Sequence, residues 1–257
     1  MENTAQRLAS GPANKRHTTP QPRTGFDGWA EGVDKADDQW NTYDCEIRSA
    51  VNEYNMHLSR TPGYVPLDWR LIKAMLWVET GAKSLAWKSR PMQIGHIEDA
   101  GLMALLGDRE GGDLVVPPSL RVSLSASSVR AEPIPNIRAG IGYLLMRMAT
   151  FAFKSILNAN DKVYEVTVKD GDSLERIAKA QGSTPEVMKK LNPSAHLLKA
   201  GQVLKYQKAA VRKVITGWMP LTSSRIAARY NVGDSDYARK MDHALPAVRK
   251  AKEAVCR

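Results

Sequence analysis

Residues 68–81 read DWRLIKAMLWVETG, a short apolar segment that ends in a glutamate, a threonine and a glycine. Asp68 can cap the start of a helix with its side-chain oxygen, and Gly81 can supply the left-handed residue that closes it. At about 100° per residue, Glu79 falls on the same face as the apolar Leu71 and Met75. Burial disfavours the charged form of a carboxyl group, so we expect a raised pKa for Glu79, which suits a general acid near neutral pH. The alternative is a surface glutamate on the last turn of the helix.

Four short motifs, in order along the chain, resemble those of the soluble lytic transglycosylase (SLT) family. They are VETG at 78–81, RPMQIG at 90–95, the segment 136–144 that begins with NI and ends with YL, and ARYN at 228–231. The family pattern is Glu-Ser-Gly, Gly-Leu-Met-Gln, Asn-Ile with Tyr-Leu, and Ala-Tyr-Asn, so Thr80, Pro91 and Arg229 depart from it. The resemblance implies a lysozyme-like domain with Glu79 as the catalytic acid. We expect these substrate-binding residues: Thr80, Trp87, Met92, Gln93, Tyr143, Tyr230 and Asn231.

The chemistry of three of these side chains suggests how each would act. Gln93 can hydrogen-bond a sugar hydroxyl or N-acetyl group, and Trp87 can stack on a pyranose face. Ordinary core packing is the alternative for Trp87. For Tyr143 buried packing is the favoured interpretation, and a place in the cleft wall is the alternative.

The character of the sequence changes at Tyr164. The alternating stretch YEVTV at 164–168 indicates a strand, and the turn and capping residues that follow predict the order strand, helix, helix, strand over 161–207. This segment closely resembles the LysM module, which binds glycans that contain N-acetylglucosamine. The resemblance implies a sugar groove formed by Gly171, Asp172, Ser173, Leu174, Asn192, Pro193 and Leu197. The alternative is that these residues only cap and turn the module.

Three of the transglycosylase motifs precede this module and the fourth follows it, so we expect an insertion into the catalytic domain. The predicted fold class is α+β, with a mostly α-helical lysozyme-like catalytic domain and an inserted small βααβ LysM module. The expected division is a flexible N-terminal tail at 1–38, the first part of the catalytic domain at 39–160, the LysM module at 161–207 and the second part of the catalytic domain at 208–257.

Within the catalytic domain, local patterns predict several further elements. Apolar spacing favours a supporting helix over 40–58, and Asn136 is a candidate cap for a long helix. The serine-rich run 123–128 favours a surface loop. We expect helical structure to resume at 215–219, and a closing helix over 237–248.

The chain has 257 residues, 43% of them hydrophobic, and a formal net charge of +10. That length accommodates a lysozyme-sized domain and a small module. The charge suits an anionic cell-wall polymer and fits nucleic acid equally well; with the motifs, we expect peptidoglycan strands and no nucleic acid as partner. No apolar run is long enough to span a membrane, and residues 1–22 lack the pattern of a secretory signal. We therefore expect synthesis in the cytoplasm without a signal peptide, and no membrane span.

Cys45 and Cys256 are the only cysteines. Two cysteines without a suitably spaced histidine make neither a metal site nor a thiol nucleophile, so we expect no metal and no cofactor. Two free thiols are the favoured interpretation. The alternative, in an oxidising compartment, is a disulfide that ties the first helix to the C-terminus.

The motifs together predict an enzyme that cleaves the β-1,4 bond between N-acetylmuramic acid (MurNAc) and N-acetylglucosamine (GlcNAc). Most glycosidases use two carboxyl groups, whereas the acids nearest downstream of Glu79 lie almost twenty residues away. The resemblance implies that Glu79 acts first as acid and then as base on the muramic 6-hydroxyl, giving 1,6-anhydro-MurNAc ends. One alternative is a hydrolytic muramidase of a phage endolysin or tail, with Glu98, Asp99 or Asp113 as second acid. Another is an inactive glycan-binding wall protein.

The site of action follows from the expected substrate. Peptidoglycan lies outside the cytoplasm, so a lytic enzyme made without a signal needs another route to it. We expect an antibacterial effector that a secretion machine delivers into the periplasm of a target bacterium, with an immunity protein in the producer. A phage endolysin is the alternative.

Overall fold

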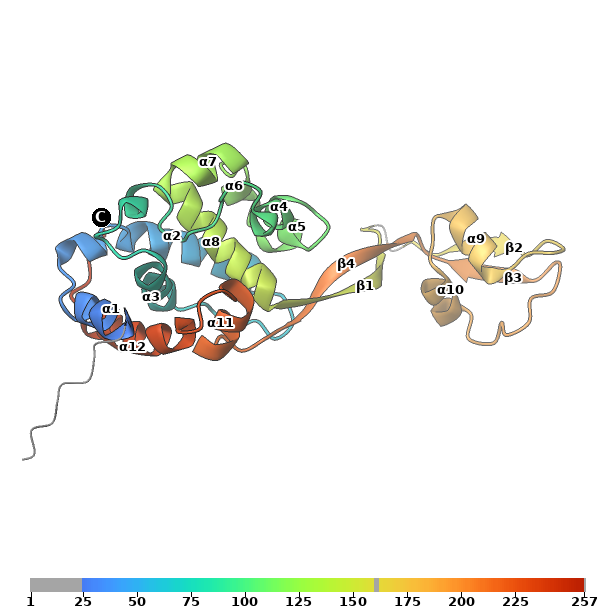
Figure 1. Cartoon of the computed structure of the whole chain (residues 1–257). Helices are drawn as coiled ribbons and strands as arrows, with labels where there is room; N and C mark the ends of the chain where they lie inside the picture. The colour runs from blue at the N-terminus through green and yellow to red at the C-terminus, as the bar shows by residue number, and fades with distance from the viewer. Residues whose placement is uncertain (1–24, 160–161, 257) are drawn as a thin grey trace, which may run out of the picture.

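The structure is a computed structural model, and it describes residues 25–159 and 162–256. The described chain is α+β, and helices dominate it. Figure 1 shows a helical domain (residues 25–148 and 219–256), a small βααβ unit (residues 162–206), and a two-stranded ribbon that joins them. None of the described helices is long and apolar enough to cross a membrane.

The helical domain begins with α1 (Gly25–Asp34), the 3-10 helix η1 (Asp38–Asn41) and α2 (Asp44–Leu58). The expectation of a flexible tail through residue 38 is therefore wrong for its described part. Ala30 and Val33 of α1 are buried, because α1 packs against the last helix of the chain. The remainder of the expected tail, residues 1–24, lies outside the described residues.

The predicted central helix is α3 (Trp69–Glu79), and its boundaries are confirmed. Asp68 accepts a hydrogen bond from the backbone N–H of Arg70 at 2.9 Å, as an N-cap does. Gly81 has a φ of +68°, and a Cβ added there would lie 2.8 Å from the Trp40 ring. Only glycine fits that turn, so the helix must end where the acid is placed.

The segment between α3 and the ribbon consists of short helices, the longer α8 and the loops that join them. Its elements are η2 (Leu85–Lys88), α4 (Ala100–Leu106), α5 (Gly112–Val115), α6 (Pro118–Arg121), α7 (Ala126–Ala131) and α8 (Pro133–Met148). The surface loop expected over 123–128 is wrong in its second half, because Ser125 and Ser128 form a capping box that starts α7. Asn136 does not cap α8, which begins three residues earlier at Pro133.

Two long strands leave the helical domain as an antiparallel ribbon. β1 (Ala149–Leu157) pairs with β4 (Ala209–Trp218), from Ala149 opposite Trp218 to Leu157 opposite Ala209. The helix expected at 215–219 is therefore wrong. Valine, isoleucine and threonine recur through β4, and β-branched side chains favour a strand when a partner strand is present.

The ribbon leads to the βααβ unit. Its elements are β2 (Tyr164–Thr167), α9 (Leu174–Gln181), α10 (Pro185–Leu191) and β3 (Val203–Tyr206), in the predicted order. β2 and β3 pair antiparallel, and Tyr164 stacks on Tyr206 at 5.3 Å between ring centroids. The unit has a hydrophobic core of its own that is separate from the core of the helical domain.

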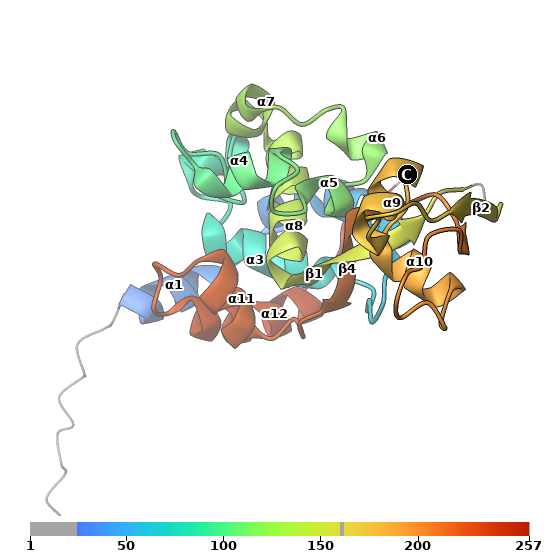
Figure 2. The ribbon, with the colours of Figure 1, turned by 90° about the vertical axis from the view of Figure 1, so that its right-hand side faces the viewer.

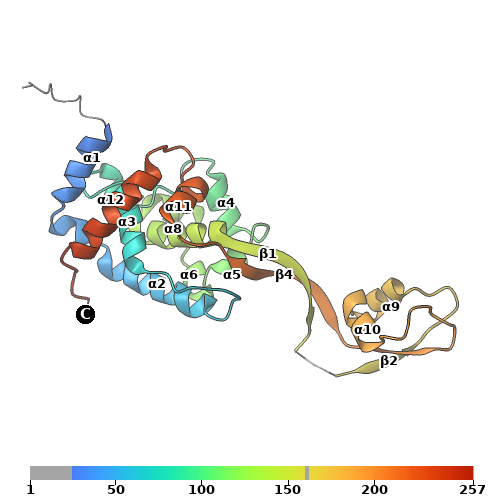
Figure 3. The same ribbon diagram turned by 90° about the horizontal axis from the view of Figure 1, so that it is seen from below.

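The chain then returns to the helical domain through α11 (Ser223–Tyr230) and α12 (Tyr237–Lys250). The helices α4 to α7 lie on one side of α3 and α8, and α11 and α12 lie on the other (Figures 1 and 2). Figure 3 shows α12 alongside α3 and α1, both of which it contacts. Glu79, at the end of α3, is therefore enclosed by segments from both halves of the chain.

The last residues run back to α2 and close the fold covalently. Cys45 and Cys256 form a disulfide across a sequence separation of 211 residues, so the expectation of two free thiols is wrong. The reason lies in the neighbouring contacts. Ala254 N–H donates to Asp44 Oδ2 at 3.1 Å, and Glu253 pairs with Arg48 at 2.7 Å. These contacts hold the C-terminal segment beside the start of α2.

Candidate functional site

A cavity of about 420 Å³ opens at the C-terminal end of α3. Its lining residues are Glu79, Met92, Gln93, Ile94, His96, Asp99, Tyr143, Tyr230 and Asn231. Six of these belong to the eight residues predicted for catalysis and substrate binding in the helical domain: Glu79, Met92, Gln93, Tyr143, Tyr230 and Asn231. The fold brings them together from four separate segments.

The carboxyl group of Glu79 lies at the end of α3 and faces this cavity. Burial raises the pKa of Glu79 to about 7, while the nearby Tyr237 hydroxyl and Asn231 side chain oppose that rise. Glu79 Oε1 and the Tyr237 hydroxyl are both buried and lack a hydrogen bond of ordinary geometry within the described residues. Their contact is therefore weak, and burial outweighs it. A carboxyl group with this pKa can hold a proton and release it at neutral pH.

Asn136 fixes the loop that forms the cavity floor. Its side chain is fully buried; it accepts from Met92 N–H at 2.8 Å and donates to the carbonyls of Ile94 at 2.8 Å and Val129 at 2.9 Å. These bonds hold the backbone on both sides of Gln93, which has a φ of +53°. Asn136 is therefore a positioning residue, and this role explains why the side chain is turned inward instead of capping α8.

α8 and α11 form the opposite wall. The rings of Tyr143 and Tyr230 meet edge to face with centroids 5.5 Å apart, and the Tyr230 hydroxyl donates to Met92 O at 2.9 Å. Burial raises the pKa of Tyr143, and raises that of Tyr230 well above its ordinary value, so both phenols are neutral at pH 7. Tyr143 combines the two roles that the sequence left open, because it packs on Tyr230 and also lines the cavity.

Trp87 and Thr80 do not line the cavity. Trp87 is 2% exposed and packs against Tyr43 and Trp40, with ring centroids 5.1 and 6.2 Å away. Sugar stacking by Trp87 is therefore wrong for this structure, and the core-packing alternative describes it. The Thr80 hydroxyl lies 3.0 Å from Pro91 O and 3.2 Å from Leu76 O, so it ties the end of α3 to the next loop.

Ile94, His96 and Asp99 line the cavity but were not among the predicted substrate-binding residues, and the sequence offered Asp99 only as a second acid for the muramidase alternative. Asp99 is the N-cap of α4 and accepts from the N–H groups of Gly101 at 2.8 Å, Leu102 at 3.1 Å and Gly95 at 2.6 Å. The signal for this cap was an aspartate directly before an apolar helical run. Because both oxygens of Asp99 accept backbone N–H groups, its carboxylate holds the start of α4 and the backbone at Gly95 in place.

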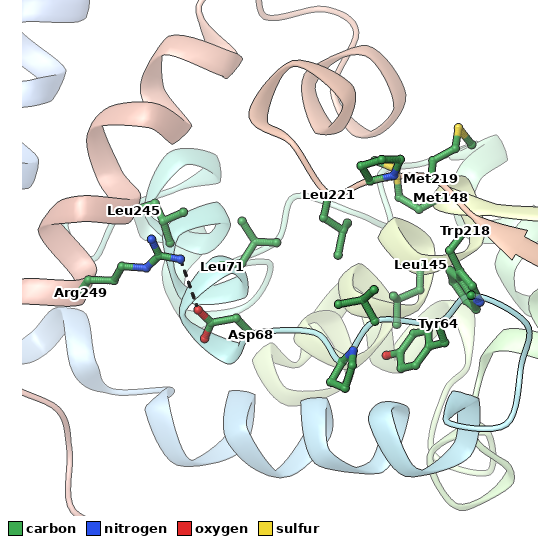
Figure 4. A pocket seen from close by; sticks show the side chains of 14 residues that line it. Tyr64, Asp68, Leu71, Leu145, Met148, Trp218, Met219, Leu221, Leu245 and Arg249 are labelled. Carbon is green, nitrogen blue, oxygen red and sulfur yellow. Dashed lines mark ion pairs between the residues drawn. The ribbon is translucent and has the colours of Figure 1, made fainter.

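A second cavity, of about 460 Å³, lies at the base of the ribbon (Figure 4). Leucine, methionine and tryptophan side chains dominate its lining. The only charged side chains that line it are Asp68 and Arg249, which pair with each other at 3.6 Å. Asp68 also caps α3, so this cavity holds no free acid and is not the site of acid chemistry.

The βααβ unit has a polar groove of its own, with a volume of about 530 Å³. Six of the seven residues predicted for glycan binding line it: Asp172, Ser173, Leu174, Asn192, Pro193 and Leu197. The seventh, Gly171, makes the preceding turn with a φ of +73°.

Several of these residues also hold the unit together, as the structural alternative requires. Ser173 caps α9, and Asp172 accepts from Lys169 N–H at 2.8 Å. The Asn192 amide bonds to both backbone groups of Lys205, at 2.7 and 2.8 Å. Leu197 is 83% exposed and is available to a ligand.

The strand, helix, helix, strand order and the separate core define a small βααβ unit that is compact on its own. Comparison with known families matches residues 166–206 to the LysM domain, a peptidoglycan-binding module. The chain therefore contains a LysM domain, as predicted. No curated protein and no solved structure matches the chain. The comparisons do not test the resemblance of the helical domain to lytic transglycosylases, which remains a hypothesis.

Proposed function

We propose that this chain is a peptidoglycan lytic transglycosylase. The LysM domain binds the glycan, and the helical domain cleaves the β-1,4 bond between MurNAc and GlcNAc. The observation that supports this most is Glu79, a carboxyl group whose pKa is about 7 in a polar cavity of about 420 Å³. Gln93 and Asn231 line the same cavity and supply amide groups that can bind sugar hydroxyl and N-acetyl groups.

In the proposed reaction, protonated Glu79 donates its proton to the glycosidic oxygen, and the C1–O bond of MurNAc breaks. The positive charge that develops on the sugar ring is then quenched by the muramic 6-hydroxyl. Its oxygen forms a bond to C1, and its proton returns to the Glu79 carboxylate. No water is consumed, and the acid is restored for the next cycle.

The cavity contains a second carboxylate, Asp99, and hydrolysis is therefore the second candidate reaction. Asp99 is the base or nucleophile that a muramidase would need. Its oxygens, however, accept three backbone N–H groups, which favours a structural role. The products separate the two reactions, since 1,6-anhydro ends are lighter than hydrolysed ends by one water.

The experiment is digestion of purified sacculi with product masses as readout. We expect the wild type to release anhydro-muropeptides and Glu79→Gln to release none, because the amide keeps the shape of the side chain but cannot donate the proton. Glu98 and Asp113, the other two acids named for the muramidase alternative, are exposed and do not line the cavity, so neither is placed as a second acid. Glu98→Gln is therefore the matched control. Activity in Glu79→Gln would overturn the assignment. Binding to sacculi without cleavage by either protein would favour the inactive wall-binding protein.

We further propose that the protein acts in the periplasm as an antibacterial effector. A disulfide such as Cys45–Cys256 persists in oxidising compartments, and peptidoglycan lies on that side of the membrane. Expression with a periplasmic export signal should lyse the host, whereas cytoplasmic expression and exported Glu79→Gln should be harmless. A neighbouring gene whose exported product binds the protein and restores growth would favour an effector over a phage endolysin. Toxicity of exported Glu79→Gln would contradict both.

A further inference from the structure

A positively charged hollow of about 310 Å³ lies beside the Glu79 cavity. Its lining residues are Arg109, Glu110, Met146, Arg147, Ala149, Phe151, Lys213 and Arg229. Four of these carry a positive charge and one carries a negative charge. The hollow is formed where the loop after α4, the end of α8, the base of the ribbon and α11 meet, so it combines both halves of the helical domain with β4.

Two helices contribute residues to both the hollow and the Glu79 cavity. On α8, Tyr143 lines the cavity and Arg147, one helical turn later, lines the hollow. On α11, Tyr230 lines the cavity and the preceding residue, Arg229, lines the hollow. The two hollows are therefore neighbours, and a ligand long enough to reach from Tyr143 to Arg147 along α8 can contact both.

The walls of the hollow are built from specific contacts. The Arg147 guanidinium donates to Arg229 O at 3.3 Å, and the Lys213 ammonium donates to the carbonyls of Asp108 and Arg109. The Lys213 bonds hold β4 against the loop after α4. Two of the four cations, Arg147 and Lys213, are thus fixed by bonds to the protein.

The other two cations remain available to a ligand. The guanidinium groups of Arg109 and Arg229 are exposed and make no hydrogen bond or ion pair with other described residues. Arg229 is also one of the residues that depart from the transglycosylase motif, where it stands between the alanine and the tyrosine. A side chain that the motif does not require is thus placed, unpaired, next to the proposed site.

We propose that this hollow binds the carboxylates of the peptide attached to the muramic sugar, and that the enzyme therefore prefers peptide-bearing glycan to bare glycan. The inference rests on the proposed function. In peptide-bearing glycan the lactyl carboxyl group is bound in an amide to the peptide, so the negative charges near the scissile bond are the several carboxylates of the peptide. Amidase treatment removes them and leaves a single lactyl carboxylate on each muramic sugar. Guanidinium groups bind carboxylates in a bidentate manner, which suits the unpaired Arg229 and Arg109.

The first test is selectivity, measured as kcat/KM on peptide-bearing glycan divided by kcat/KM on the same glycan after amidase treatment. We expect Arg229→Ala to lower this ratio about fivefold, the upper end of the effect of an ion pair at an exposed site. Arg225→Ala is the matched control, because Arg225 lies exposed on the same helix one turn earlier and does not line either cavity. An unchanged ratio in Arg229→Ala would overturn the proposal.

The second test does not depend on catalysis. The probe is MurNAc-tetrapeptide, added to Glu79→Gln protein and followed by NMR, with the carboxyl-amidated peptide as the matched ligand. We expect the free carboxylates to strengthen binding, and Arg229→Ala to remove that difference. Equal binding of the two peptides would overturn the proposal even if the enzyme cleaves glycan. If the wild type cleaves no glycan but the peptides still differ, the proposed function fails and the carboxylate site stands.

Discussion

Replacing Glu79 with glutamine should stabilise the protein at high pH while it removes the proposed acid. The pKa of the carboxyl group rises from 4.5 in a free side chain to about 7 in the fold. The unfolded chain therefore loses its proton near pH 4.5, whereas the folded chain keeps it up to about pH 7. Between these values the folded state binds more protons, so the free energy of unfolding falls as the pH rises.

The size of this effect follows from the shift itself. Each pKa unit corresponds to about 1.4 kcal/mol, so the ionised carboxylate costs the fold about 3 kcal/mol above pH 7. Glutamine has the same shape and never ionises. We expect Glu79→Gln to match the wild type at pH 4 and to be more stable by about 3 kcal/mol at pH 8.

Urea unfolding, followed by tryptophan fluorescence at several pH values, measures this difference. All six tryptophans lie outside the LysM domain, so the signal reports the helical domain and the base of the ribbon. Glu98→Gln is the control, since Glu98 is exposed. The same pH trend in that variant, or a difference for Glu79→Gln that does not change between pH 4 and pH 8, would refute the argument that burial raises the pKa of Glu79.

Three further predictions concern the parts that hold the site. Cys45→Ser should lower the free energy of unfolding by up to about 5 kcal/mol, the chain-entropy value for a closed loop of this size. A reducing agent should lower the free energy of unfolding of the wild type and leave that of Cys45→Ser unchanged. Asn136→Ala should cost about 3 kcal/mol and raise KM, because it leaves three buried backbone groups unpaired; wild-type stability would contradict its positioning role. Replacing residues 158–208 with an Asn-Gly turn should join the paired ends of β1 and β4 and abolish binding to sacculi, while cleavage of short soluble glycans is retained. Equal loss on both substrates would show that the LysM domain also shapes the cavity.

The features that the sequence predicted are those encoded in short stretches. The capped helix at 69–79 and the partial burial of its last residue follow from spacing within fourteen residues. The LysM domain was predictable because all its turns, caps and strands lie within about forty consecutive residues.

The features that the sequence did not predict depend on pairing between distant segments. β1 and β4 pair across the whole LysM domain, and without its partner strand the end of β4 was wrongly predicted to be helical. The disulfide joins residues 211 positions apart, and the sequence offered it only as the alternative to two free thiols, because spacing alone does not show that the two segments meet. The prediction that Trp87 stacks on a sugar was wrong for another reason. An aromatic residue in a loop of polar neighbours suits a sugar platform and a core anchor equally, and only the position of Trp40 decides between them.

Helix α3 carries a group that destabilises the fold, Glu79, and also two side chains whose ion pairs fasten the helix to the rest of the domain. At its C-terminal end, ionised Glu79 weakens the fold by about 3 kcal/mol at neutral pH. Its N-terminal half is fastened, since Lys73 pairs with buried Asp44 at 2.8 Å and Arg70 pairs with Glu253 of the segment that the disulfide secures. The disulfide restrains the unfolded chain, and its contribution can offset a cost of this size. The fold therefore tolerates the buried carboxyl group best where the cysteines are oxidised.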